Sequence, residues 1–176
     1  MFRRSRKPLD EAALYDYAVG ALGRRMRTVA ELKRLLRQRV VPDESGRALV
    51  EAVVRKLKEQ KYLNDSAYAA TYSTLRRENQ KLGKHRVVTD LKARGVHGDL
   101  IEQAVGEAYS GVDEEKLARQ FLARKRLKKP ATRKDSARIF RTLARAGFAT
   151  RSIVRILKKW EVDDEVLTAL ETEKDY

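Results

Sequence analysis

One pattern of apolar residues with helical spacing occurs twice along the chain. Residues 85–96 read HRVVTDLKARGV, and residues 137–148 read ARIFRTLARAGF. In both stretches two apolar residues lie four positions apart, and a glycine and then a hydrophobic residue follow four positions later. Apolar residues at i and i+4 share one face of an α-helix, and a glycine just beyond them is typical of a helix C-terminus. The pattern therefore predicts two amphipathic helices that end in the same way.

A third copy of the pattern is found near the start of the chain. The aligned positions are Val87, Leu91, Gly95 and Val96; Ile139, Leu143, Gly147 and Phe148; and Leu32, Leu36, Val40 and Val41. A helix-period segment precedes each copy and another follows it. The predicted fold is all-α: three tandem three-helix repeats, at residues 9–62, 63–110 and 111–176, with a short extra C-terminal helix in the last. We expect the array to be elongated and curved, and residues 1–8 to form a basic disordered tail.

Helical periodicity continues from end to end, and no alternating strand pattern of useful length is present. The ten predicted helices span residues 10–23, 28–39, 47–60, 65–79, 84–94, 98–109, 113–128, 135–146, 150–159 and 163–173. Thr28 and Glu31 have the spacing of a capping box. Acidic residues that favour a helix start stand at Asp65, Asp113 and Asp163. Gly95 with Gly98 resembles a helix-hairpin-helix turn, but the spacing is one residue too long, so a helix cap is the favoured interpretation.

Composition limits the compartment in which such a chain works. The sequence contains no cysteine, which excludes disulfides and fits a reducing, cytoplasmic location. No apolar run approaches the ~18 residues that a membrane span needs. The opening MFRRSRKPLD lacks the apolar centre of a signal peptide. We therefore expect a cytoplasmic protein without a membrane segment.

The residues that could support catalysis are few. The only histidines are His85 and His97, and neither has a second ligand at metal-binding spacing. The acidic clusters at 113–115 and 163–165 stand at predicted helix starts, where negative charge is favourable in any case. No phosphate-binding glycine loop is present, because KLGKHR lacks the upstream glycine. We expect no enzymatic activity, no catalytic residue, no cofactor and no metal.

Positive charge is the strongest indication of a partner. Lys and Arg number 40 against 25 Asp and Glu, a formal net charge of +15. Residues 1–62 contain 16 basic and 8 acidic side chains, residues 63–110 contain 7 and 6, and residues 111–176 contain 17 and 11. A field of this sign attracts polyanions, of which nucleic acid is the most common. The first and third repeats are therefore expected to bind a polyanion, while the nearly neutral middle faces something else.

Basic residues gather in two stretches of the sequence. Arg138, Arg141 and Arg145 recur at i, i+3 and i+7, on one face of a predicted helix. Phe148 and Trp160 are expected to pack in the core rather than stack on bases. The candidate contact residues are Arg24, Arg25, Arg27, Arg34, Arg37, Arg86, Lys92, Arg124, Lys125, Arg126, Lys128, Lys129, Arg138, Arg141, Arg145, Arg151, Arg155 and Lys158.

Several of these residues also match a known family pattern. The sequence resembles the bacterial RecX regulatory protein family most strongly over residues 60–105, and the resemblance extends over most of 10–160. In the second repeat it rests on Leu63, Asp65, Tyr68, Ala69, Gly83, Arg86, Val87, Leu91, Gly95 and Val96, and in the first on Thr28, Glu31 and Leu32. Val40 departs from the pattern because glycine is usual there. This departure places the cap of the first repeat in question.

The resemblance implies a partner and an activity. It implies a protein that lies in the groove of the RecA recombinase filament on single-stranded DNA and inhibits ATP hydrolysis, strand exchange and filament extension. The basic residues named above would then contact RecA or DNA, with weak binding to duplex DNA, and a monomer would suffice. The alternative is a DNA-binding architectural or transcription factor that acts without RecA. That alternative predicts tight binding to naked duplex DNA and a symmetric dimer.

Overall fold

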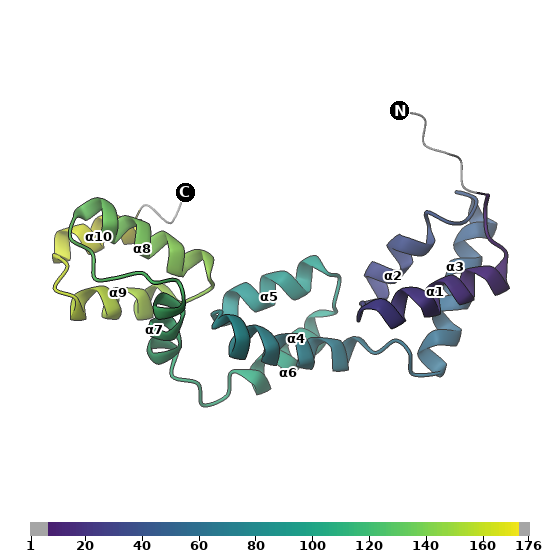
Figure 1. Cartoon of the computed structure of the whole chain (residues 1–176), viewed down its shortest axis with the longest axis horizontal. Coiled ribbons are helices and arrows are strands. Elements are labelled where there is room, and N and C mark those ends of the chain that lie inside the picture. Colours follow the sequence, from purple (N-terminus) through teal and green to yellow (C-terminus); the bar gives the residue numbers. More distant parts are fainter. Residues whose placement is uncertain (1–6, 173–176) are drawn as a thin grey trace. The chain divides into compact units, whose positions relative to one another are not determined.

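The computed structural model describes residues 7–172, and all regular secondary structure in that range is α-helical (Figure 1). The helices are α1 (Glu11–Arg24), α2 (Val29–Leu36), α3 (Glu44–Glu59), α4 (Asp65–Gln80), α5 (Lys84–Ala93), α6 (Gly98–Ala108), α7 (Glu114–Arg124), α8 (Arg133–Arg145), α9 (Thr150–Lys159) and α10 (Asp164–Thr172). The predicted all-α class is confirmed. Residues 1–6 of the predicted tail and residue 173 of the last predicted helix lie outside the described residues.

Two predicted helices end earlier than expected, for reasons of backbone geometry. The predicted helix 113–128 ends at Arg124, because Arg126 adopts a positive φ of 55° and the N–H of Leu127 turns back to the carbonyl of Leu122 at 2.9 Å. This is the Schellman arrangement, with a basic residue in place of the usual glycine. The predicted helix 28–39 ends at Leu36. The basic residues that follow Arg124 therefore lie in a loop and not on a helix face.

Two other helices begin earlier than predicted, because their caps were not recognised. Asp43 accepts the backbone N–H of Gly46 at 2.7 Å, and α3 starts directly after it. Thr132 accepts the N–H of Asp135 at 3.1 Å at the start of α8. Short polar side chains at these positions satisfy N–H groups that have no partner within the helix.

The capping box of α2 is confirmed. Thr28 accepts the N–H of Glu31 at 3.0 Å, and the Glu31 carboxylate accepts the N–H of Thr28 at 3.4 Å. At the start of α4 the cap is Asn64, which accepts an N–H at 2.9 Å, and not Asp65. The Asp65 carboxylate instead accepts the N–H of Val29 at 2.9 Å. One side chain of α4 thus caps the first turn of α2.

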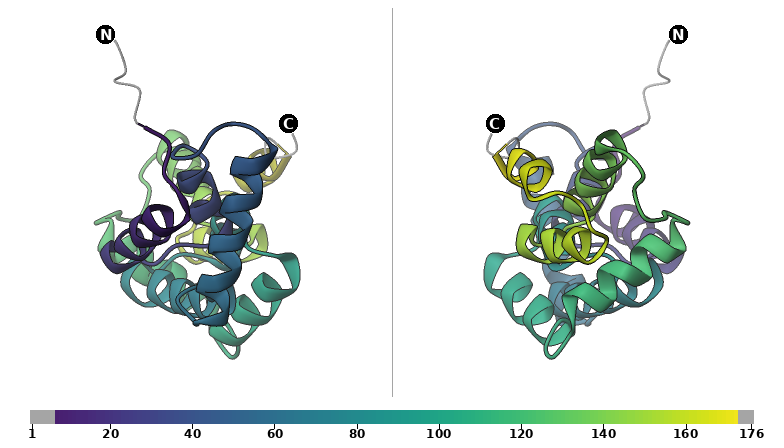
Figure 2. Two further views of the ribbon diagram at one scale, coloured as in Figure 1. Left: turned by 90° about the vertical axis from the view of Figure 1, so that its right-hand side faces the viewer. Right: turned by 90° about the vertical axis from the view of Figure 1, so that its left-hand side faces the viewer.

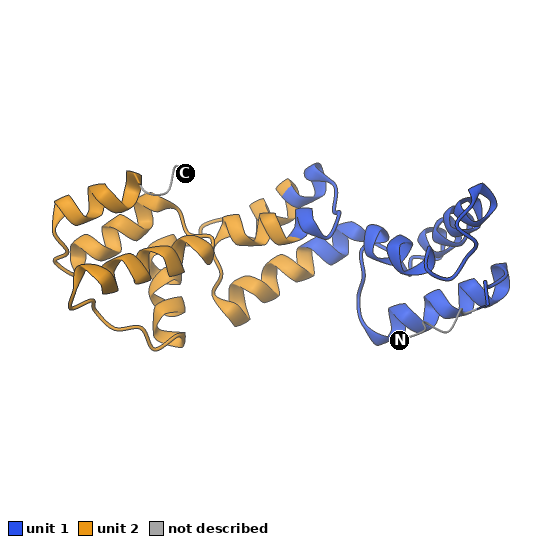
Figure 3. Cartoon of the chain, turned by 90° about the horizontal axis from the view of Figure 1, so that it is seen from above, with its two compact units in different colours: residues 1–69, 91–101 blue, residues 70–90, 102–176 orange. Residues whose placement is uncertain are grey.

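The described residues divide into two compact units (Figure 3). Unit 1 comprises residues up to 69 together with 91–101, and unit 2 comprises 70–90 together with residues from 102 onward. The core of unit 1 lies between α1, α2 and α3 and is aliphatic: Leu14, Ala18, Leu32, Leu36, Val53 and Leu57 are buried in it. The predicted third copy of the apolar pattern is wrong in its last position, because Val41 is 46% exposed.

The core of unit 2 lies between α7, α8, α9 and α10, and α9 contacts each of the other three helices (Figures 1 and 2). Phe148 is buried against Phe121, with ring centroids 5.8 Å apart in an edge-to-face arrangement. Trp160 packs partly buried against the same core, so the packing role predicted for both aromatic residues is confirmed. The extra helix α10 contributes the buried side chains of Leu167 and Leu170. It is therefore part of this core.

Within unit 1, the end of α5 meets the start of α2. The Thr28 hydroxyl donates to the carbonyl of Arg94 at 2.7 Å, and the Arg94 guanidinium pairs with Glu31 at 2.6 Å. Gly95 has a φ of 76°, and a Cβ there would lie 2.5 Å from the Cβ of Ala30. Gly95 thus does two things: it ends α5, as predicted, and it lets the two helix ends approach.

Within unit 2, the end of α8 meets the start of α5 in a similar way. The N–H of Gly83 donates to the carbonyl of Ala146 at 2.8 Å, and the N–H of His85 donates to the carbonyl of Gly147 at 3.2 Å. Gly147 has a φ of 89°, and a Cβ on it would overlap the backbone nitrogen of Arg86. The contact is backbone against backbone, so no side-chain rotation can relieve an added methyl group.

Gly147→Ala is expected to destabilise the protein more than a positive φ alone explains. The new Cβ meets both a left-handed backbone and the start of α5, and we expect the free energy of unfolding to fall by about 3 kcal/mol. Gly111→Ala is the matched control: Gly111 also has a positive φ, 66°, but open space around it. Its loss should be only about 1 kcal/mol. Urea unfolding followed by circular dichroism measures both, and equal losses would contradict a role for the contact between α8 and α5.

Candidate polyanion-binding surfaces

The first basic surface lies in unit 1, around the end of α1 and along α2. Arg24 is the last residue of α1, and Arg25 is its C-cap. Arg34 lies in the last turn of α2, and Arg37, three residues later, is the C-cap of that helix. All four side chains are exposed. Arg27 differs, because it is half-buried and its Nε donates to the carbonyl of Ala21 at 3.3 Å. That bond gives Arg27 a structural role at the end of α1.

The second basic surface lies in unit 2 and starts in the loop after α7. Arg124, Lys125, Arg126, Lys128 and Lys129 are all exposed. The ammonium of Lys125 lies 5.9 Å from the centre of the Phe121 ring, and Lys129 pairs with Glu161. The positive φ of Arg126 and the end of α7 at Arg124 place these side chains on a turning backbone. They therefore do not form one stripe, as the predicted longer helix would have arranged them.

A stripe of basic residues does run along α8. Arg138, Arg141 and Arg145 are exposed, whereas Ile139, Phe140 and Leu143 of the same helix are buried in the core. The apolar face thus fixes the opposite, basic face toward solvent. Arg138 lies 3.5 Å from Asp135, and the Nε of Arg145 donates to the carbonyl of Arg141 at 3.3 Å. Asp135 is the only carboxylate on this helix.

The basic residues of α9 are engaged with carboxylates of neighbouring helices. Arg155 and Lys159 both approach Glu115 of α7, at 3.6 and 2.8 Å. Lys158 pairs with Asp164 of α10 at 2.9 Å. These pairs neutralise part of the charge of α9. Arg151, at the start of α9, is exposed and lines a pocket described below.

The ion pairs of unit 2 change the acidity of their members. The hydrogen bond from Lys159 holds the pKa of Glu115 below its ordinary value, and the charges of Lys159 and Arg155 act in the same direction. The hydrogen bond from Lys129 likewise lowers the pKa of Glu161. The hydrogen bond to Asp164 raises the pKa of Lys158.

The two remaining candidates lie on α5. Arg86 is exposed and its Nε lies 3.0 Å from Asp90, one turn further along the helix. The hydroxyl of Tyr72 also donates to Asp90, at 3.1 Å. Lys92 is exposed in the last turn. Arg86 belongs to unit 2 and Lys92 to unit 1, so the structure describes each in its own unit only.

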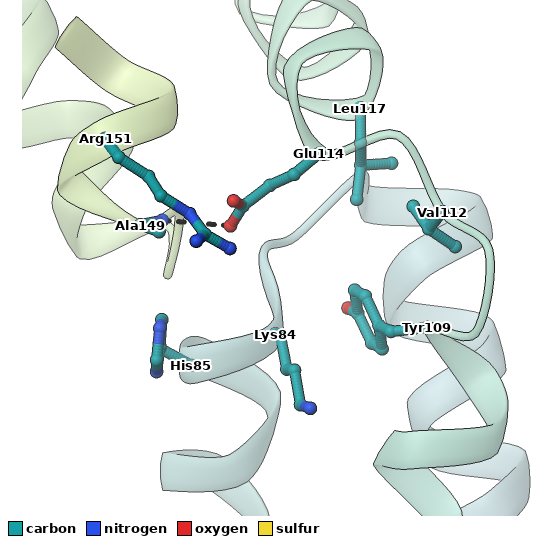
Figure 4. A pocket seen from close by; sticks show the side chains of 8 residues that line it. All are labelled: Lys84, His85, Tyr109, Val112, Glu114, Leu117, Ala149 and Arg151. Atoms are coloured by element: carbon teal, nitrogen blue, oxygen red, sulfur yellow. Dashed lines mark hydrogen bonds between the residues drawn. The ribbon is translucent and has the colours of Figure 1, made fainter.

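Sequence reasoning missed a pocket of about 210 Å³ in unit 2 (Figure 4). It is lined by Lys84, His85, Tyr109, Val112, Glu114, Leu117, Ala149 and Arg151. These residues come from the starts of α5, α7 and α9 and from the segment after α6. No local motif joins them, because only the tertiary fold brings the segments together.

Two lining residues of the pocket are held by hydrogen bonds. The carboxylate of Glu114 accepts the N–H of Ala149 at 2.9 Å and the hydroxyl of Ser152 at 2.5 Å, so it caps α9 from α7. The hydroxyl of Tyr109 donates to the carbonyl of Leu82 at 2.8 Å, and burial raises the pKa of this phenol above its ordinary value. Glu114 thus has a tertiary capping role that its place in the first turn of α7 did not reveal.

Two further features of residues 7–172 bear on the site. Within that range, no group of three or more His, Cys, Asp or Glu side chains is arranged to hold a metal ion. None of the helices described there combines the length and the apolar character needed to cross a membrane.

Comparison with known proteins gives one consistent family. Residues 64–105 match the model of "RecX, second three-helix domain". The chain is 31% identical over 141 residues to "Regulatory protein RecX" of Thermobifida fusca, an alignment that covers 78% of this chain and 73% of the relative. It is 30% identical over 167 residues to the protein of the same name from Bacillus pumilus, covering 87% of this chain and 62% of the relative.

The solved structures agree in fold. A "Crystal structure of regulatory protein RecX" superposes with a TM-score of 0.70 at 22% identity, covering 85% of this chain and 73% of that one. At this identity the similarity concerns the fold alone. The chain spans less than two thirds of the length of several relatives. It covers 62% of the one from Bacillus pumilus and 52% of each of two from Geobacillus species.

Replacing Lys159 by Gln is expected to raise the pKa of Glu115 toward its ordinary value, because the strongest hydrogen bond to the carboxylate is lost. A depressed carboxyl pKa contributes stability that is present above the unfolded pKa and is lost as the pH falls through the folded pKa. Carboxyl carbon chemical shifts followed by NMR across the acidic range measure the change. Lys158→Gln is the control, because Lys158 pairs with Asp164; an equal response in both variants would contradict the assignment.

Proposed function

Because the chain belongs to the RecX family of regulatory proteins, we propose that it binds the RecA recombinase filament on single-stranded DNA and inhibits its ATP hydrolysis, strand exchange and extension. Membership of the family is the observation that carries the choice of RecA. We further propose that the protein acts as a cytoplasmic monomer and not as an enzyme. Such regulation needs only binding, since a ligand that favours one state of the filament shifts its population toward that state.

The basic surfaces support a partner that contains nucleic acid. The α8 stripe combines three exposed arginines with a helix whose opposite face is fixed in the core. Basic side chains that neutralise phosphates release condensed counterions, which supplies most of the sequence-independent affinity for nucleic acid. The exposed arginines around α1 and α2 provide a second cationic surface in unit 1. A filament that presents both DNA phosphates and protein carboxylates offers partners to both surfaces.

The alternative, a DNA-binding factor that acts without RecA, is favoured by the same charge. The two functions differ in how the protein should bind bare DNA. A direct binder of duplex DNA should show an affinity that falls with salt concentration with a log–log slope of about −0.9 per phosphate contacted. It should also saturate bare DNA before it changes RecA activity. A regulator of the filament should act at concentrations well below those at which it covers bare DNA.

The triple variant Arg138→Glu, Arg141→Glu and Arg145→Glu is expected to weaken inhibition of RecA ATP hydrolysis on single-stranded DNA. Each arginine faces solvent, so the reversal repels phosphate or acidic protein surface without disturbing the core. We expect the concentration needed for half inhibition to rise by about tenfold or more, since three charge contacts of ~0.5–1 kcal/mol each are reversed. The protein is titrated from well below to above the RecA concentration, and anisotropy reports binding to bare DNA in parallel.

The matched control is the variant Arg47→Glu, Arg55→Glu and Lys58→Glu. These residues are exposed on α3 and lie outside both basic surfaces, and the change in net charge is the same. The α3 variant should inhibit RecA ATP hydrolysis more strongly than the α8 variant does. Unchanged inhibition by the α8 variant, with its helicity intact, would exclude the stripe as a contact surface. Inhibition that begins only when bare DNA is saturated would favour the RecA-independent alternative.

A further inference from the structure

The pocket of unit 2 combines a cationic side with an apolar side (Figure 4). Lys84 and His85 come from the first turn of α5, and Arg151 comes from the first turn of α9. All three side chains are exposed at the rim. The opposite side is formed by the ring of Tyr109 together with Val112 and Leu117. A ligand that fits this pocket carries negative charge at one end and a flat or apolar group at the other.

Two basic side chains of the lining, Lys84 and Arg151, stand against one carboxylate, that of Glu114, so the formal charge of the lining is positive. Both oxygens of Glu114 already accept hydrogen bonds at the start of α9, from the N–H of Ala149 and the hydroxyl of Ser152. The planar guanidinium of Arg151 has five N–H donors and is suited to bind an oxyanion through two of them. Lys84 adds a compact positive charge on a flexible stem. The rim can therefore hold a phosphate group.

The apolar side is rigid and small. The hydroxyl of Tyr109 is bonded to the carbonyl of Leu82 at 2.8 Å, which fixes the orientation of its ring. Leu117 is part of the core of unit 2. A volume of about 210 Å³ is below the ~300–1,000 Å³ that is usual for pockets that enclose a drug-sized ligand. The pocket thus has room for one planar ring system, and the rest of a larger ligand stays outside it.

We propose that this pocket binds one nucleotide unit of single-stranded nucleic acid, with its base against Tyr109, Val112 and Leu117 and its phosphate on Lys84, His85 and Arg151. An unpaired base exposes its face and can contact an aromatic ring, whereas a base within a duplex cannot enter a pocket. The chain's excess of basic residues brings nucleic acid to the protein, and the pocket then distinguishes single strands from duplexes.

The position of the pocket agrees with this proposal. The carbonyl of Gly147, just beyond α8, accepts the N–H of His85 at 3.2 Å. The C-terminal end of α8 is therefore held against the start of α5, which carries Lys84 and His85, within the same unit. A strand whose phosphates follow α8 would reach the pocket without leaving unit 2. The proposal rests on the proposed function for the presence of single-stranded DNA, but its test contains no RecA, so each can fail without the other.

The test compares two labelled oligonucleotides of equal length by fluorescence anisotropy: an oligothymidylate, and one in which every base is replaced by an abasic site. The native protein should bind the oligothymidylate about tenfold more tightly, a ratio within the range measured for one stacked base. Val112→Phe, which fills the apolar side, should remove this preference while leaving the affinity for the abasic strand unchanged. Equal affinity of the native protein for both strands would overturn the proposal.

The double variant Lys84→Gln and Arg151→Gln tests the cationic rim. It should weaken binding of both oligonucleotides by about tenfold and make the salt dependence less steep, because phosphate contacts are lost. The control is Lys58→Gln with Arg119→Gln, which removes the same charge from exposed positions of α3 and α7 that do not line the pocket. A loss of equal size in the control would show that only net charge matters and would overturn the role of the rim.

A measurement on the unaltered protein avoids any effect of substitution on folding. An oligonucleotide that contains 5-iododeoxyuridine is bound and irradiated, and the cross-linked residue is identified by mass spectrometry. Cross-linking to Tyr109 is expected, because the base is placed against its ring. Cross-links confined to other aromatic residues would contradict the placement of the base. Excess unlabelled duplex of the same length should leave the Tyr109 cross-link in place, whereas loss of the cross-link would contradict selectivity for single strands.

Discussion

Hydrogen bonds between the end of one helix and the start of another constrain both units of the described structure. At the start of α5 the N–H groups of Gly83 and His85 donate to the carbonyls of Ala146 and Gly147. At the start of α2 the Thr28 hydroxyl donates to the carbonyl of Arg94. The first N–H groups and last carbonyls of a helix lack partners within the helix, and here one end supplies what the other needs. Glycines 95 and 147 make this possible, because a Cβ on either would collide with the opposing helix.

These contacts also determine where the charge lies. Because Ile139, Phe140 and Leu143 are buried and the end of α8 is bonded to α5, the arginine face of α8 cannot turn inward. The acidic residues are used differently: Glu114 caps α9, Glu115 pairs with α9 and Asp65 caps α2. These three carboxylates thus hold helices together, and the arginine side chains of α8 are exposed to solvent. The excess of basic residues, a net charge of +15, is therefore presented on particular surfaces of the protein.

Much of the fold could be predicted from the sequence, because helical periodicity and caps are local signals. The apolar positions Val87, Leu91, Ile139 and Leu143 are all buried as expected. At the starts of α3 and α8 the usual cap residues, Asp43 and Thr132, were not recognised. Other errors arose where a helix end lacks its usual residue. Arg126 takes a left-handed conformation that normally marks a glycine, so the end of α7 was placed too late. At Val40 glycine is absent, and Val40 does not have a positive φ. The copy of the pattern near the start of the chain therefore ends differently, and Val41 faces solvent.

The candidate site was harder to predict than the fold. A basic residue is readily expected to be exposed, but whether it has an acidic partner depends on contacts between distant segments. Nothing near Arg155 or Lys159 in the sequence indicates that Glu115, about forty residues earlier, lies beside them. The pocket illustrates the same limit, because its lining spans residues 84–151 and no two of its segments form a motif. The division into three repeats and the individual contact residues stay predictions.

The contacts at the starts of α2 and α5 share a polarity that has its own consequence. In each, a carbonyl at the C-terminal end of one helix accepts hydrogen bonds at the N-terminal end of another. The donors are backbone amides at α5 and the Thr28 hydroxyl at α2. At the start of α5 the partial negative charge of the carbonyls after α8 meets the partial positive charge of the backbone amides, which is an attraction between main-chain groups. Reversing the direction of one of the two helices would set like partial charges against each other. The polarity of the contact is therefore set by the peptide backbone at the start of α5, whereas at the start of α2 it also requires the side chain of Thr28.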